Sequence, residues 1–205
     1  MAGRDFWISL AEHADTDDLR DRILAGYKEG KPFTPYVPTI PMPEPLDSVL
    51  DFGCGLGRNF PYLSAIAQSV AGFDLPPMIE RCREVAGGMV ALLSPDWNQL
   101  RQLRFDLIFT TLVLQHIEPD PARAFLRDFS SMTPSVYLLT RTDTDFGENL
   151  LQIVADSGIF DVVGDCVEVD HDPETHQLKV VGRMTFEDAR KLPEGRHVEL
   201  MLRTR

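Results

Sequence analysis

The segment SVLDFGCGLGRNF, residues 48–60, is the most informative part of the sequence. A short apolar run leads into Gly53, Gly55 and Gly57, and a segment with helical character follows. Glycines at such a junction permit a tight turn and let the backbone approach a ligand closely. The helix that follows presents free N–H groups and the positive end of its dipole. A molecule bound at this loop should therefore offer a carboxylate or a phosphate.

The spacing of the glycines separates two kinds of cofactor loop. A dinucleotide fingerprint of the form G-x-G-x-x-G would put its third glycine at residue 58, where the chain has Arg58. That side chain would obstruct the close packing of helix against strand, which makes a nicotinamide oxidoreductase the weaker alternative. The third glycine is Gly57 instead, and an acid, Asp51, lies two residues before Gly53.

Three segments carry a resemblance to a known family. The loop Asp51-Phe52-Gly53-Cys54-Gly55-Leu56-Gly57 resembles motif I of the class I S-adenosylmethionine (SAM)-dependent methyltransferases. The next predicted strand ends at Asp74, 21 residues after Gly53, where that family places an acid. The segment FDLIFTTLVLQHIEPD, residues 105–120, is similar to motif IV of small-molecule members such as those of quinone biosynthesis. The resemblance covers roughly residues 46–141.

The resemblance implies roles for residues around SAM. Backbone groups near Gly53 and Gly55 would hold the methionine portion, and Asp51 would attract the ammonium directly or through water. Asp74 would accept hydrogen bonds from the ribose diol, or cap the following helix, or do both, and Leu75 would pack on adenine. The expected cofactor-binding residues are Asp51, Phe52, Gly53, Cys54, Gly55, Gly57, Asp74, Leu75, Ser94, Asp96, Trp97 and Thr110.

The third predicted strand departs from the family pattern. An acid near the adenine amino group usually follows this strand, but here Ser94 and Pro95 come first and the first acid is Asp96. Either Asp96 takes that role one turn later, or backbone groups of Ser94 make the contact. Trp97 could stack on the adenine, although a buried packing tryptophan is the simpler interpretation.

His116 is the candidate catalytic residue. It follows the fourth predicted strand, at the carboxyl edge where ligands bind in such sheets. An ordinary histidine has a pKa suited to proton transfer near neutrality, which an oxygen or protonated nitrogen acceptor requires. The alternatives are a histidine that packs or caps locally, or one that only shapes the acceptor pocket. His171 and His176 flank two acids, but such a turn is more often solvated, so we expect no metal.

Charge and local motifs argue against nucleic acid as a partner. The net charge is −12, from 20 basic and 32 acidic side chains, so the surface repels phosphate backbones. The Asn/Asp-Pro-Pro-Tyr quartet of amino-directed nucleic-acid methyltransferases is replaced by Thr110-Thr111-Leu112. We therefore expect a small-molecule acceptor.

Cysteine usage and hydropathy indicate a cytoplasmic protein. The three scattered cysteines fit reduced thiols better than a disulfide framework. No apolar run reaches membrane-spanning length, and the N-terminal residues lack the apolar core of a secretory signal. We expect no membrane partner, and the sequence leaves the oligomeric state open.

Strands and helices alternate from residue 46 onward, which predicts a doubly wound, mostly parallel sheet. A hairpin around HDPETH and a last strand near the C-terminus predict an antiparallel edge. The resemblance implies a seven-stranded α/β sheet of the Rossmann-like methyltransferase type, one strand fewer than the segments with strand character in the chain. The predicted strands are 48–51, 69–74, 89–93, 105–110, 136–140, 165–170, 178–183 and 196–203, and the helices are 59–68, 77–86, one capped by Asp120, and 146–157.

Residues 1–45 are expected to form an addition to a SAM-binding domain of residues 46–205. Residues 5–30 predict two short helices, the second capped by Thr16. Residues 31–45 hold six prolines and should run extended. This segment is either a strap across the domain, which we favour, or part of a lid, in which Phe33 and Tyr36 would line a substrate site.

The leading hypothesis is an enzyme (EC 2.1.1.-) that transfers the SAM methyl group to a small molecule by in-line displacement and leaves S-adenosylhomocysteine. The alternative is a non-catalytic SAM-binding partner or sensor subunit. The sequence does not identify the acceptor, because substrate identity lies in the proline-rich segment, the region after His116 and the C-terminal hairpin.

Overall fold

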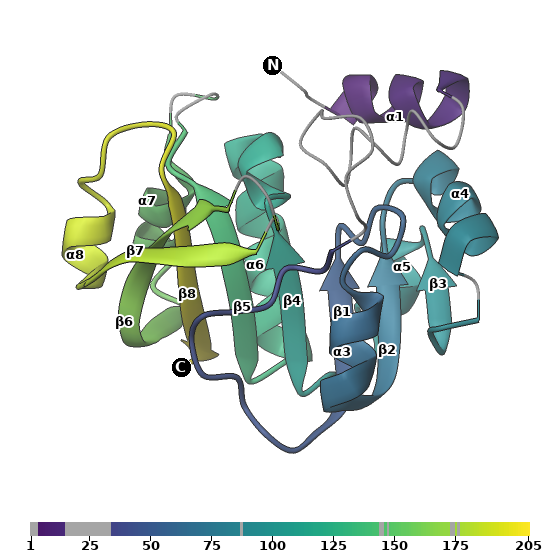
Figure 1. Cartoon of the computed structure of the whole chain (residues 1–205), viewed down its shortest axis with the longest axis horizontal. Coiled ribbons are helices and arrows are strands. Elements are labelled where there is room, and N and C mark those ends of the chain that lie inside the picture. The colour runs from purple at the N-terminus through teal and green to yellow at the C-terminus, as the bar shows by residue number, and fades with distance from the viewer. Residues whose placement is uncertain are drawn as a thin grey trace.

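The computed structural model describes residues 4–14, 34–86, 88–143, 146, 148–172, 175 and 177–205. Its centre is an eight-stranded sheet with the order β3-β2-β1-β4-β5-β8-β6-β7 (Figure 1). The strands are β1 Leu46–Phe52, β2 Ala67–Phe73, β3 Leu92–Ser94, β4 Leu107–Thr111, β5 Ser135–Arg141, β6 Phe160–His171, β7 Leu178–Met184 and β8 His197–Thr204. The helices are α1 Arg4–His13, α3 Phe60–Ile66, α4 Pro76–Ala86, α5 Trp97–Leu100, η1 Leu114–His116, α6 Pro119–Met132, α7 Leu150–Ser157 and α8 Phe186–Ala189.

The first five strands are parallel, which brings their carboxyl ends to one edge of the sheet. At this edge β1 lies between β2 and β4, with Phe52 opposite both Phe73 and Thr110. All five residues of β4 are buried, as expected for a strand covered on both faces. The chain reverses its winding direction on either side of β1, and such switch points are where ligands bind in open α/β sheets.

The C-terminal strands form the predicted antiparallel edge. β8 pairs antiparallel with both β5 and β6, and β7 pairs with β6 as the outer strand of a hairpin. The predicted α/β class, the mostly parallel sheet and the antiparallel edge are confirmed. The sheet has eight strands where the resemblance implied seven, because β7 adds one strand beyond β6.

Two hydrophobic clusters cover the two faces of the sheet. Helices α5, α6 and α7 pack on one face around Leu50, Ile108 and Phe129. Helices α3 and α4 pack on the other, around Val49 and Phe109. Neighbouring residues of one strand therefore bury into opposite clusters, as the alternation of side chains along a strand requires.

Several element boundaries differ from the prediction. Helix α6 begins at Pro119 with Glu118 at the cap position, two residues before the predicted cap Asp120, because proline at the first helical positions needs no N–H partner. Helix α7 begins after Asn149, whose side chain accepts a hydrogen bond from the Leu151 N–H, and not at Phe146. It ends at Gly158 with a φ of 64°, as predicted. The short helices α5 and α8 were not predicted, because four residues show no helical period.

The N-terminal part contributes one described helix and a strap. Helix α1 confirms the first predicted helix, whereas the second, with Thr16, lies outside the described residues, as does Phe33. Residues 34–43 contain no helix or strand and cross in front of β4 and β5 before turning under the sheet to β1 (Figure 1). Tyr36 and Ile40 are buried in the cluster around Val49, which supports the strap interpretation. We call residues 34–43 the strap.

Candidate functional site

The glycine loop follows β1 at the carboxyl edge of the sheet. Gly53, Gly55 and Gly57 have φ values of 78°, 54° and 83°, which residues with a Cβ rarely adopt. A Cβ on Gly53 would overlap the side chain of Val113, in the segment after β4. The N–H groups of Gly53 and Cys54 both donate to the Phe73 carbonyl, at 2.8 and 3.0 Å. The loop is therefore held against the ends of both β2 and β4.

Asp51 lies directly before this loop and is fully buried. Neither of its carboxylate oxygens has a hydrogen bond within the described part of the chain. Burial is the main cause that raises the pKa of Asp51 to about 8, and the charge of Asp74 adds to the rise, while the side chain of Asn59 lowers it. A buried carboxylate without a partner is unfavourable, so the site is prepared for a cationic group.

Asp74, at the end of β2, holds the glycine loop. Its Oδ2 accepts a hydrogen bond from the Gly55 N–H at 2.7 Å, and its Oδ1 accepts one from the Leu75 N–H at 2.7 Å. Burial raises the pKa of Asp74 to about 6, and these two bonds partly offset the effect. Leu75 lies one residue before α4, so this bond is not a helix cap, and the predicted capping role of Asp74 stays a prediction. The carboxylate retains lone pairs for further donors.

Helix α1 covers the outer side of this region. Its Ala11 is buried in a small cluster with Leu56 of the glycine loop and Met78 of α4. Trp7 and Leu75 are partly buried against the same cluster. Leu75, the predicted adenine contact, therefore packs among apolar side chains that α1 covers.

The segment after β3 places its three predicted residues in different environments. Ser94 is buried, and its hydroxyl donates to the Gln99 side chain at 2.8 Å. Asp96 is exposed and caps α5 by accepting from the Asn98 N–H. Trp97 packs against a group of four phenylalanines, and its Nε1 donates to Asp128 at 2.7 Å. That group consists of Phe52, Phe73, Phe125 and Phe129.

The chain after β4 turns sharply back over the glycine loop. Leu112 has a φ of 58°, a left-handed conformation that costs a bulky residue energy and that clusters at functional sites. Thr110 is buried within β4, and its hydroxyl has no hydrogen bond within the described residues. The candidate base His116 ends η1, and its ring lies 6.1 Å from the Trp7 ring of α1, centroid to centroid.

The structure thus brings together Asp51, the loop glycines, Asp74, Leu75 and Thr110 at one edge of the sheet, with His116 beside α1. Sequence reasoning missed Asn59, Val113 and Trp7. Asn59 follows the loop directly, so its position in the motif was the available signal. Val113 and Trp7 gave none, because their contacts come from distant parts of the chain.

The predicted solvated turn of the hairpin has one unexpected feature. The ring of His171 stacks between Tyr36, with centroids 5.3 Å apart, and His197, with centroids 4.7 Å apart. His176 lies outside the described residues. No group of three or more metal-ligating side chains occurs among the residues that the structure describes.

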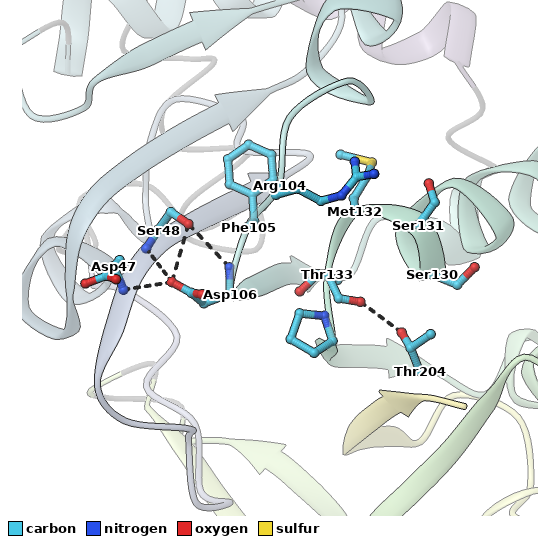
Figure 2. Close-up of a pocket in the computed structure, with 11 residues that line it drawn as sticks. Asp47, Ser48, Arg104, Phe105, Asp106, Ser130, Ser131, Met132, Thr133 and Thr204 are labelled. Atoms are coloured by element: carbon cyan, nitrogen blue, oxygen red, sulfur yellow. Dashed lines mark hydrogen bonds between the residues drawn. The ribbon is translucent and has the colours of Figure 1, made fainter.

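A hollow of about 650 Å³ lies at the opposite, amino edge of the parallel strands (Figure 2). Its polar groups largely bond to one another: Asp106 accepts hydrogen bonds from the Asp47 and Ser48 N–H groups, and Thr204 donates to the Thr133 carbonyl. The glycine loop does not border this hollow. We therefore assign the functional site to the carboxyl edge, where Asp51 lacks a partner.

Comparison with known proteins agrees with this geometry. The family model described as methyltransferase domain matches residues 13–198. No curated protein matches the chain. None of the described helices combines the length and the apolar character that a membrane span requires.

Solved structures show the same fold at low sequence identity. The N-methyltransferase NodS from Bradyrhizobium japonicum WM9, in complex with S-adenosylhomocysteine, is 15% identical over 78% of this chain and 78% of its own, with a TM-score of 0.53. Magnesium protoporphyrin IX methyltransferase from Synechocystis PCC 6803, with bound SAM, is 18% identical over 97% and 81%, with a TM-score of 0.51. A structure from a study of thioacetal formation in echinomycin biosynthesis is 17% identical over 93% and 92%, with a TM-score of 0.54.

Proposed function

The chain belongs to the methyltransferase domain family, and from that premise we propose that it methylates a small-molecule acceptor by in-line displacement. It is a SAM-dependent methyltransferase of the class I fold. The observation that carries our assignment of the site is the buried carboxylate of Asp51, which has no hydrogen bond within the described residues.

The residues around Asp51 fit the amino-acid end of SAM. An ammonium group placed beside Asp51 would supply the partner that the carboxylate lacks and would stabilise its ionised form. Gly53 and Gly55 carry no side chain of their own, so a ligand can approach the loop backbone closely where Val113 does not cover it. We assign the methionine portion to this loop, with Phe52, Cys54, Gly57 and Thr110 as its surroundings.

The end of β2 fits the nucleoside part. Asp74 already accepts two backbone hydrogen bonds and can accept more from two ribose hydroxyls. Leu75 offers an apolar surface for the adenine beneath α1. Ser94 and Asp96 lie at and just after the end of the neighbouring strand β3, where they could accept a hydrogen bond from the adenine amino group. We assign Trp97 to packing, because four phenylalanines and Asp128 already surround it.

The chemistry divides between cofactor and protein. The bound cofactor supplies an electrophilic methyl group on a sulfonium, and the protein's part is to hold the acceptor in line with it. Helix α1 shields the loop from water through Ala11 and its neighbours. His116 lies beside Trp7 at the same edge, and we assign it to removing a proton from the acceptor.

Two observations favour a small acceptor. The net charge of −12 opposes the binding of a nucleic-acid backbone. Helix α1 covers the glycine loop and the start of α4, and it places Trp7 next to His116, which narrows the approach to the edge of the sheet. NodS and the magnesium protoporphyrin IX enzyme are methyltransferases on the same fold, so this framework is compatible with different acceptors.

Calorimetry and a turnover assay test the proposal. SAM and S-adenosylhomocysteine should each bind with one site per chain, and Asp74→Ala should weaken both. Incubation with SAM and a panel of small acceptors should release S-adenosylhomocysteine. Binding without turnover on any acceptor would favour the alternative of a SAM-binding partner or sensor subunit. Absence of binding would refute the site assignment.

A further inference from the structure

We propose that Asn59 is a positioning residue, which links the cofactor-side carboxylate of Asp51 to the end of β4 and to the strap. This inference rests on the proposed function, because it concerns the same site. Asn59 is buried at 3% exposure, directly after the glycine loop and before α3. We assign Asn59 no direct contact with the cofactor or the acceptor. It acts through the residues to which it is hydrogen-bonded.

The side chain of Asn59 forgoes its usual local role. Asparagine before the first turn of a helix normally caps the helix by accepting a backbone N–H. Here Asn59 occupies the cap position of α3, yet its side chain makes no capping hydrogen bond. Its amide is directed instead to segments that are distant in the sequence.

Two hydrogen bonds define that direction. The Asn59 Oδ1 accepts from the backbone N–H of Tyr36 in the strap at 3.2 Å. The Asn59 Nδ2 donates to the Thr111 hydroxyl at the end of β4 at 3.2 Å. Thr111 precedes the left-handed Leu112, where the chain turns back over the glycine loop. Asn59 therefore fixes the turn that leads to His116.

The third group in reach of Asn59 is Asp51. Neither Asp51 oxygen accepts a hydrogen bond of standard geometry from the described residues, but the Asn59 side chain lowers the pKa of Asp51 against the larger effect of burial. Among the residues that the structure describes, the ionisable groups that interact with Asp51 are Asp74, which raises the Asp51 pKa, and the thiol of Cys54. Asn59 is the group that favours the ionised form.

A neutral amide suits this position better than a cation. Lysine or arginine would form an ion pair with Asp51 and would compete with an incoming ammonium. An amide N–H favours the carboxylate by a weaker interaction and leaves its charge uncompensated. Asn59 thus keeps Asp51 available for the cofactor while it ties the loop to the acceptor side.

The test compares Asn59→Ala and Asn59→Leu, an uncharged side chain of similar shape, with Thr39→Val. Thr39 anchors the strap elsewhere, through its hydrogen bonds to Glu199, so Thr39→Val loosens the strap without touching Asp51. The Asp51 pKa is measured in the cofactor-free protein from the carboxyl carbon signal by NMR. The dissociation constant of SAM is measured by calorimetry at several pH values, and kcat and KM are measured for any acceptor found.

We expect both Asn59 variants to raise the Asp51 pKa and Thr39→Val to leave it unchanged. Below that pKa, each unit of rise should weaken SAM binding about tenfold, with the difference shrinking at higher pH. Asn59→Leu branches at the same carbon and adds no charge, so it tests the loss of the amide even where Asn59→Ala fails to fold. An unchanged Asp51 pKa in both Asn59 variants, or an equal rise in Thr39→Val, would overturn the inference. Absence of SAM binding in the wild type would refute the proposed function, and the NMR comparison would still decide the role of Asn59.

Discussion

The guanidinium carbon of Arg58 lies 3.8 Å from the centre of the Tyr36 ring. The Arg58 Nε also donates to the Thr34 carbonyl at 2.6 Å. Arg58 is the residue that breaks the dinucleotide glycine pattern, and it is buried by the strap rather than wedged between helix and strand. The residue that excludes one cofactor class therefore also fastens the strap to the cofactor loop.

Replacing Arg58 by alanine should destabilise the protein by about 2 kcal/mol, because it removes a desolvated cation–π contact and a charged hydrogen bond. The free energy of unfolding in urea measures this loss. Arg104→Ala is the matched control, since Arg104 is exposed and its guanidinium donates to the carbonyl of the neighbouring Leu103. Equal stability of both variants would contradict the anchoring role.

A methyl group at Gly53 should disable the cofactor loop. Gly53→Ala places a Cβ at a φ of 78° and into the side chain of Val113. The backbone strain alone costs about 1–2 kcal/mol, and SAM binding should weaken as the loop shifts. Adding Val113→Ala should relieve the overlap and leave the strain. Gly182→Ala, where no atom lies within 4 Å of the added Cβ, serves as the control in thermal unfolding and calorimetry.

SAM binding should release a proton, because Asp51 has a raised pKa of about 8 in the cofactor-free protein and an ammonium partner lowers it. Affinity should therefore increase as the pH rises from about 6 towards 8. Calorimetry in buffers of different ionisation enthalpy measures the released proton directly. The same binding heat in every buffer near pH 7 would count against an ion pair with Asp51.

The stability of the cofactor-free protein should show the opposite trend. A carboxyl whose folded pKa is raised takes up a proton on folding, so its contribution weakens the fold as the pH rises from about 4, the unfolded value, to about 8. Asp51→Asn removes this proton uptake, so the unfolding free energy of the variant should depend less on pH between about 4 and about 8. Parallel pH curves for Asp51→Asn and the wild type would show that Asp51 is ionised throughout.

His116→Asn should reduce kcat by about 10²–10⁴-fold if the acceptor loses a proton in the slow step, while the SAM dissociation constant stays within about twofold. The wild-type kcat should fall at low pH as the base becomes protonated, and the variant should lose this fall. These effects require that His116 act on the acceptor and not on the cofactor. A variant with wild-type kcat and a raised acceptor KM would assign His116, together with Trp7, to the wall of the pocket.

The sequence predicted the fold class and the cofactor loop for local reasons. Gly53, Gly55 and Gly57 follow a buried strand and precede a helix, and the backbone angles that they adopt are those that glycine permits. The alternation of strands and helices fixed the parallel sheet, and the parallel sheet brings Asp51 and Asp74 to one edge. The beginning of α6 was placed too late, since both Pro119 and Pro121 can start a helix.

The amino-acid sequence is enough to show where the backbone must turn, which segments are strands and which acids follow them, because these properties depend on neighbouring residues. Three contacts become visible in the folded chain alone: Asn59 bonds to both the strap and β4, Val113 packs against Gly53, and Arg58 lies over the Tyr36 ring. Each of these pairs joins segments that are far apart in the chain. These contacts depend on the order in which the strands lie side by side in the sheet. No local pattern of residue types specifies which distant segments meet.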